Sequence, residues 1–119
     1  MYMLIAPIIK ILLLSLAATL LVELAAAYFM KVSVRDLSVV ALVNLMTNPP
    51  YVLFILVCRY FFSPQAILIL QIVCEIIIIV IEAKLYRAHL KSYSRPYTLS
   101  IIANLLSITA GAALSHIMF

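Results

Sequence analysis

Three glutamates interrupt the most apolar stretches of this 119-residue sequence. Glu23, Glu75 and Glu82 each stand among aliphatic side chains, where a charged carboxylate is costly unless it is paired. A carboxyl group inside an apolar helix is by default a candidate for proton or cation handling. No Lys or Arg shares the expected depth of Glu75. We therefore expect this group to be protonated, hydrogen-bonded to an amide, or bound to a cation.

Amide and hydroxyl side chains accompany the carboxyl groups. NLMTNPP occupies positions 44–50 and NLLS occupies positions 104–107. Spacings of three, four and seven residues place each polar set on one face of its helix. The predicted binding residues are Glu23, Asn44, Thr47, Asn48, Glu75, Glu82, Asn104 and Ser107. No catalytic residue or cofactor is predicted, and the pattern does not decide whether a metal ion binds.

A purely structural interpretation of these polar residues stays open. Asn, Ser and Thr side chains join membrane helices by hydrogen bonds, and small residues allow helices to approach closely. The expected position of Glu82 is near the membrane surface, where it could pair with a nearby arginine (35, 87 or 95). On this interpretation the polar residues hold the helices together and bind nothing else.

The double proline at positions 49 and 50 is the strongest local signal. Proline has no N–H, so the carbonyls of Leu45 and Met46 lose their helical partners, and the residue before a proline is pushed away from helical angles. We expect a break or kink in this span, about 18 Å from the nearest loop and level with Glu75. Free carbonyls, Asn48 and Glu75 would then form a hydrogen bond that shares a proton, or a cation site. A structural kink without a ligand is the alternative.

The composition places these residues in lipid. Hydrophobic residues make up 68% of the chain and charged residues 10%, which is too few polar groups to cover a water-soluble domain. About 20 apolar residues cross a bilayer as a helix. We predict an all-α, polytopic membrane protein, with residues 1–119 as one domain and spans at about 5–29, 37–62, 66–86 and 97–119. The first span lacks the features of a signal peptide, so we expect it to be retained.

The basic residues predict the orientation of the spans. Six of the eight lie in or beside the first and third connections, namely Lys31, Arg35, Lys84, Arg87, Lys91 and Arg95. Loops rich in Lys and Arg face the cytoplasm, so both termini are predicted to be outside the cell membrane. Aromatic residues agree with two interfaces: Tyr28, Phe29, Tyr86, Tyr93 and Tyr97 on the inner side, and Tyr2, Tyr60, Phe61, Phe62 and Phe119 on the outer side. The bilayer is the predicted partner, and nucleic acid is not.

The two halves of the chain carry a weak internal repeat. In both RDLSVVALVNLMT and RPYTLSIIANLLS, an arginine precedes Asn-Leu-x-[Thr/Ser] by nine residues. Glu23 and Glu82 precede their asparagines, Asn44 and Asn104, by 21 and 22 residues. We therefore predict two helical hairpins related by a pseudo-two-fold axis along the membrane normal, an arrangement found in transporters.

The segments NLMTNPP, VIEAKLYR and NLLS together resemble small four-helix bacterial membrane proteins that have no assigned activity. This resemblance covers about two-thirds of the chain and implies only the architecture. LLVELAAAYFMKVS also resembles the first helix of small multidrug resistance transporters, which implies a coupling role for Glu23. The remaining sequence departs from that family because it has no Trp and a single Gly. A third, short likeness is the spacing of the two glutamates in EIIIIVIEA, which is that of prokaryotic diacylglycerol kinase.

Two functions of different classes fit these observations. The first is a small proton- or cation-coupled transporter, expected to be a homo-oligomer. The alternative is an accessory or structural subunit of a larger membrane complex, in which the polar residues serve packing. An intramembrane enzyme ranks last, because no Ser–His or Cys–His pair shares a depth in the predicted spans.

Overall fold

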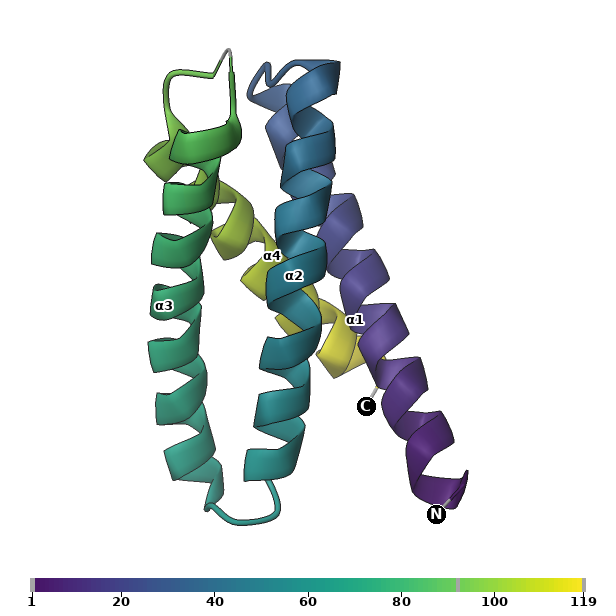
Figure 1. The fold of residues 1–119 in the computed structure, drawn as a ribbon. Helices are drawn as coiled ribbons and strands as arrows, with labels where there is room; N and C mark the ends of the chain where they lie inside the picture. Colours follow the sequence, from purple (N-terminus) through teal and green to yellow (C-terminus); the bar gives the residue numbers. More distant parts are fainter. Residues whose placement is uncertain (1, 92, 119) are drawn as a thin grey trace.

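A computed structural model of the chain describes residues 2–91 and 93–118, with side chains for residues 5–91 and 93–113. These residues form four α-helices: α1 (Tyr2–Phe29), α2 (Val34–Cys58), α3 (Pro64–His89) and α4 (Pro96–Met118) (Figure 1). Each helix is long and apolar enough to cross a membrane. The predicted all-α class with four spans is confirmed, and the fold is compatible with a multi-pass membrane protein.

Side-chain caps fix where the second and third helices begin. Ser33 precedes α2 and its hydroxyl accepts a hydrogen bond of 3.2 Å from the Asp36 N–H. Ser63 caps α3 in the same way, with the Ala66 N–H as the donor at 3.3 Å. Pro64 follows at the first helical position, where its missing N–H costs nothing. The local sequence therefore determines where both helices begin.

The end of α1 is closed by a residue in the left-handed region. Lys31 has a φ of 68°, a conformation that costs a residue with a β-carbon about 1–2 kcal/mol. Its N–H donates to Tyr28 O and the N–H of Val32 donates to Ala27 O, both at 3.0 Å. These two bonds form a Schellman motif. The side chains of Val32 and Ala27 are both buried in the main core, which stabilises the turn.

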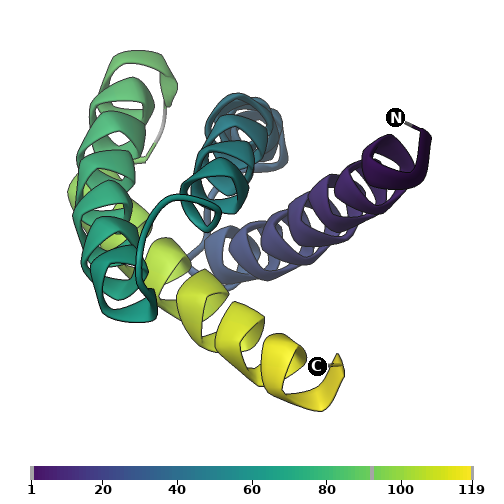
Figure 2. The same cartoon turned by 90° about the horizontal axis from the view of Figure 1, so that it is seen from below.

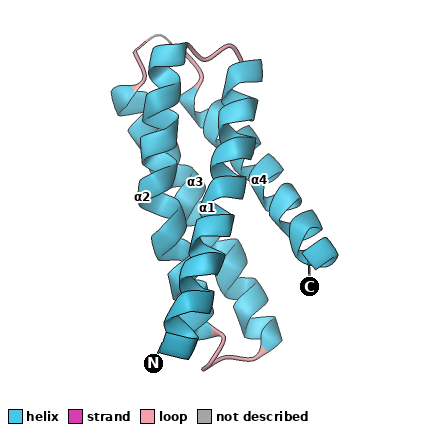
Figure 3. Ribbon diagram, turned by 90° about the vertical axis from the view of Figure 1, so that its right-hand side faces the viewer, coloured by secondary structure: helices cyan, strands magenta, loops and turns pink. Residues whose placement is uncertain are grey.

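The four helices pack as a closed ring in which each helix contacts two others. Helix α1 contacts α2 and α4, and α3 contacts the same two helices. The α1–α2 and α3–α4 loops lie at one end, and both chain termini point toward the other (Figures 1 and 3). Viewed along the bundle, the terminal ends of α1 and α4 diverge (Figure 2). The ring is therefore tighter at the end with two loops.

Burial follows the same gradient. The main core lies near the two loops and contains the fully buried side chains Ala27, Val40, Tyr86 and Leu99. A second, smaller core of Ile55, Cys58 and Ile67 joins α2 and α3 at the opposite end. No described side chain in residues 5–22 of α1 or 105–113 of α4 is buried. These surfaces are apolar and are suited to lipid or to another polypeptide.

Two sequence predictions need correction. Helix α2 runs without a break through Pro49 and Pro50, so the predicted break is wrong. The prolines still leave the carbonyls of Leu45 and Met46 without helical donors, but the flanking turns are held by the packed bundle. The Tyr86 side chain was expected among the aromatic residues of the inner interface, but it is fully buried in the main core.

The other aromatic residues predicted at the two interfaces differ in exposure, and the side chains of two of them are not described. Tyr28, Phe29, Tyr60, Phe61, Phe62 and Tyr97 are exposed, and Tyr93 is half-buried. The side chains of Tyr2 and Phe119 lie outside the described part. The orientation of the chain in a membrane and the two-fold relation between the hairpins stay predictions.

Candidate functional site

Glu82 is the centre of a polar cluster inside the bundle. Its side chain is 1% exposed. The Thr47 hydroxyl donates to Oε2 and the Asn104 amide donates to Oε1, both at 2.6 Å. The Glu82 carboxyl of α3 thus accepts hydrogen bonds from neutral donors of α2 and α4. An arginine partner, which we considered if the polar residues serve packing alone, is not the group that binds it.

Asn104 reaches Glu82 from a fixed position on α4. Its amide also donates to the Ser100 carbonyl one turn earlier, at 2.8 Å. The Ser100 hydroxyl donates to the Ile79 carbonyl of α3 at 2.7 Å. Both Ser100 and Asn104 are buried. These contacts hold α4 against α3 and orient the amide toward the carboxyl.

Asn44 occupies the corresponding place on α2. It is 1% exposed, and its amide donates to the Val40 carbonyl at 2.8 Å, as Asn104 does to Ser100. Its second partner is the Tyr86 hydroxyl at 3.3 Å. Both asparagines therefore point to α3, where Tyr86 follows Glu82 by one turn. A two-fold axis would send one of them to α1, so these hydrogen bonds do not follow the predicted symmetry.

Glu23 lies in α1 and has no such partners. Its side chain is fully buried, and neither carboxyl oxygen has a hydrogen-bond partner among the described residues. Asn48 of α2 approaches α1 one turn away, where its amide donates to the Thr19 hydroxyl at 3.1 Å. The side-chain amide oxygen of Asn48, Oδ1, is also buried without a partner in the described part of the chain. Three oxygen acceptors in this region thus have no hydrogen-bond donor among the described residues.

The remaining predicted site residues lie at the edge of the cluster. Glu75 is half-buried and lies near the Tyr51 hydroxyl. Of the partners expected for Glu75, Asn48 donates its amide to Thr19 of α1 instead. Ser107 is half-buried and makes no hydrogen bond to a described residue. The structure therefore brings together Thr47, Glu82 and Asn104, and leaves Glu75 outside this group.

Three participating residues were not predicted from the sequence. The Tyr86 hydroxyl accepts a hydrogen bond from Asn44, and Tyr51 lies near Glu75. Each tyrosine lies three or four positions along its helix from another predicted site residue. That spacing is a signal for a shared face. Asp36 is buried at the looped end, where its Oδ1 accepts a 3.3 Å hydrogen bond from the Lys91 N–H. The motif Ser33-x-x-Asp36 is the signal for its place at a helix start.

The cluster can bind a positive charge with oxygen atoms. Its groups are the two carboxyls of Glu23 and Glu82, the three amides of Asn44, Asn48 and Asn104, and the Thr47 hydroxyl, with the Tyr86 phenol at one side. The described residues contain no group of three or more His, Cys, Asp or Glu side chains that would hold a metal ion. No protein family, curated protein or solved structure matches this chain. The site is therefore interpreted from its own geometry.

Proposed function

We propose that this chain is a small membrane transporter in which Glu23 and Glu82 handle the transported or coupled proton or monovalent cation. The observation that carries the proposal is the state of Glu23. A fully buried carboxyl whose oxygens have no described partner is the group that most needs a proton or a cation. The nearby unpartnered oxygen of Asn48 adds a neutral ligand of the same kind.

The two carboxyls differ in a way that suits exchange. Glu82 is held by two short hydrogen bonds, which fix its position and satisfy both of its oxygens. Glu23 is not held in this way, so a ligand on Glu23 competes with no internal hydrogen bond. We assign the exchanging role to Glu23 and the anchoring role to Glu82. Asn44, Thr47, Asn48 and Asn104 support these two carboxyls, while Glu75 and Ser107 belong to the periphery.

An oligomer fits the exposed surfaces of the bundle. No described side chain in residues 5–22 or 105–113 is buried, and the ends of these two helices diverge (Figure 2). A second copy packed there would cover these apolar faces. The same surfaces also favour the second candidate function, an accessory subunit whose larger partner covers them.

Flux measured in liposomes tests the transport proposal. Purified protein is reconstituted in vesicles that contain a pH-sensitive dye, and a pH, Na⁺ or K⁺ gradient is imposed. We expect wild-type protein and Ser107→Ala to dissipate at least one of these gradients, and Glu23→Gln to dissipate none. Circular dichroism and gel filtration must show that Glu23→Gln remains folded.

Two results would reject the proposal. One is a folded wild-type protein that dissipates none of the gradients, and the other is a Glu23→Gln protein with full flux. A stoichiometric partner recovered with the tagged chain from native membranes, together with absent flux, would establish the accessory-subunit function instead.

A further inference from the structure

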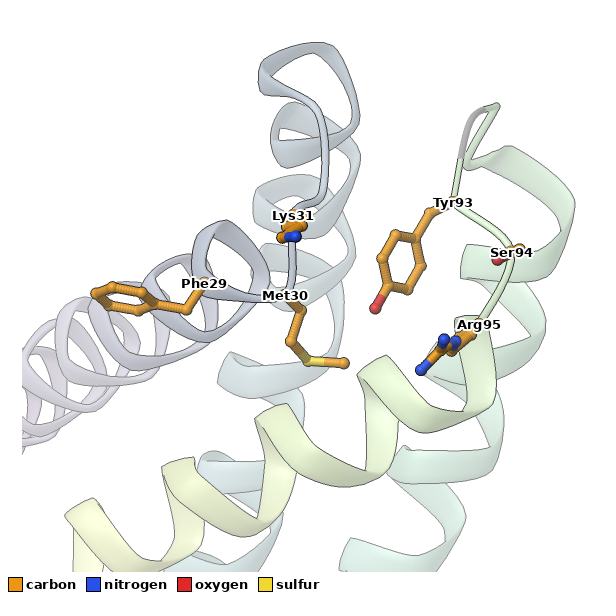
Figure 4. Close-up of a pocket in the computed structure, with 6 residues that line it drawn as sticks. All are labelled: Phe29, Met30, Lys31, Tyr93, Ser94 and Arg95. Carbon is orange, nitrogen blue, oxygen red and sulfur yellow. The ribbon is translucent and has the colours of Figure 1, made fainter.

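A cavity lies at the looped end of the bundle, away from the carboxyl cluster. It has a volume of about 310 Å³ and is lined by Phe29, Met30, Lys31, Tyr93, Ser94 and Arg95 (Figure 4). Phe29 is the last residue of α1, Met30 and Lys31 follow it in the α1–α2 loop, and the other three residues precede α4. The contact between α1 and α4 thus brings two loops that are far apart in sequence to the same cavity.

The lining of this cavity is positively charged. It contains the Lys31 ammonium and the Arg95 guanidinium together with the hydroxyls of Tyr93 and Ser94. None of the four acidic residues of the chain belongs to the lining. Within the described part of the chain, no hydrogen bond or ion pair engages the charged groups of Lys31 and Arg95. The cavity therefore offers unused donors to an anion.

The types of donor match a phosphate group. Arginine presents a planar fork of N–H donors that fits two phosphate oxygens, and lysine adds a compact charge. The Tyr93 hydroxyl points toward the space between Met30 and Arg95 (Figure 4). A phosphate placed there would meet cations from both loops. Arg95 precedes α4 directly and Lys31 is fixed by the Schellman turn, so the positions of both backbones are set by the fold.

The surroundings of the cavity favour a lipid over a free ion. Phe29 and Met30 form an apolar wall. Tyr28, Phe29 and Tyr97 are 64%, 81% and 44% exposed, and aromatic residues of this kind lie at the headgroup level of a bilayer. This end of the bundle is the one predicted to face the cytoplasm, where anionic lipids are concentrated.

We propose that this cavity binds the phosphodiester of an anionic phospholipid, with Lys31 and Arg95 as its charged ligands. The acyl chains would extend along the exposed apolar faces of α1 and α4. The site is independent of the transport proposal, because none of its residues belongs to the carboxyl cluster.

Lipid retention measured by native mass spectrometry tests this site. Detergent-purified full-length protein is incubated with phosphatidylglycerol, with phosphatidylcholine of the same chain length, or with inorganic phosphate. The test variant is Lys31→Asn with Arg95→Gln. Asparagine tolerates left-handed angles, so the α1–α2 turn is kept. The matched control is Lys84→Gln with Arg87→Gln. This control removes two exposed cations that are also predicted to face the cytoplasm but do not line the cavity.

We expect wild type and control to retain phosphatidylglycerol in preference to phosphatidylcholine. Retention by the test variant should fall by at least about tenfold, since each cation adds to the binding of anionic lipid. Equal loss in the control would reduce the effect to general charge and overturn the site, as would undiminished retention by the test variant. Binding of inorganic phosphate to wild type, with no preference for phosphatidylglycerol, would overturn the assignment to a lipid.

Discussion

The amide of Asn104 donates a hydrogen bond of 2.6 Å to a carboxyl oxygen of Glu82, and both side chains are buried. This contact joins the last helix to the third at the level where Thr47 of α2 binds the other oxygen of the same carboxyl. One side chain therefore connects three of the four helices. Loss of either donor leaves a buried carboxyl oxygen unsatisfied, so the effect on stability should be measurable.

Asn104→Ala should lower the free energy of unfolding. Interhelical hydrogen bonds in membrane proteins contribute roughly 0.6 kcal/mol on average and up to about 1.7 kcal/mol, and we expect a loss of about 1 kcal/mol or more because the acceptor is fully buried. Ser107→Ala on the same helix is the control, since that hydroxyl bonds to no described residue. Equilibrium unfolding in mixed micelles measures both variants. Equal stability of the two variants would show that the Asn104–Glu82 bond contributes nothing.

Leucine replacements of Glu23 and Glu82 should change the free energy of unfolding in opposite directions. Glu23→Leu removes buried oxygens that have no described donor, so we expect stability to rise by about 1 kcal/mol. Glu82→Leu leaves the donors of Thr47 and Asn104 unpaired, which should cost about 1–3 kcal/mol. The same unfolding assay compares them. A large destabilisation by Glu23→Leu would mean that its carboxyl has a partner in the membrane.

Lys31→Gly should stabilise the fold. Glycine adopts left-handed angles without the penalty of about 1–2 kcal/mol that a β-carbon carries. The greater freedom of glycine in the unfolded chain offsets roughly 0.5–1 kcal/mol of this gain, so a net stabilisation of about 0.5–1 kcal/mol is expected. Val34→Gly, at the first position of α2, tests whether flexibility alone has this effect. Thermal unfolding should give the order Lys31→Gly, wild type, Val34→Gly. A Lys31→Gly protein less stable than wild type would contradict the left-handed turn.

Cysteine labelling tests the predicted orientation. Single cysteines are placed at Ser94 and Phe61, both exposed and at opposite ends of the bundle, in a background where Cys58 and Cys74 are replaced by alanine. An impermeant maleimide added to intact cells should label position 61 and leave position 94 unlabelled until the cells are opened. Labelling of position 94 from outside would reverse the orientation based on the positive residues.

The helices were predictable because their signals are local or depend on composition. Long apolar runs gave the four spans, and the serines at 33 and 63 mark two starts. The end of α2 was placed at residue 62, but the helix ends at Cys58, because aromatic residues 60–62 are apolar without being helical. Apolar character alone does not report where a helix stops.

The pairing of polar residues was only partly predictable. Periodicity placed Asn44, Thr47 and Asn104 on inward faces, but it does not specify how the helices rotate against one another. Asn48 was therefore expected beside Glu75, while in the packed bundle its amide donates to Thr19 of α1. The double proline was predicted to break α2 for a similar reason. Local backbone preference does not include the neighbouring helices that keep α2 continuous. Tyr86 was taken for an interface residue because its amphipathic side chain suits both places.

The contact between α1 and α4 also sets an order of assembly. The chain is made from its N-terminus, so Glu23 and Glu82 are both synthesised before Asn104. Until α4 inserts, Oε1 of Glu82 lacks the donor that it has in the finished protein, and the ring of helices cannot close. A nascent chain that stops in the α3–α4 loop would leave this carboxyl without its amide. The last helix therefore completes both the ring of helices and the hydrogen bonding of Glu82.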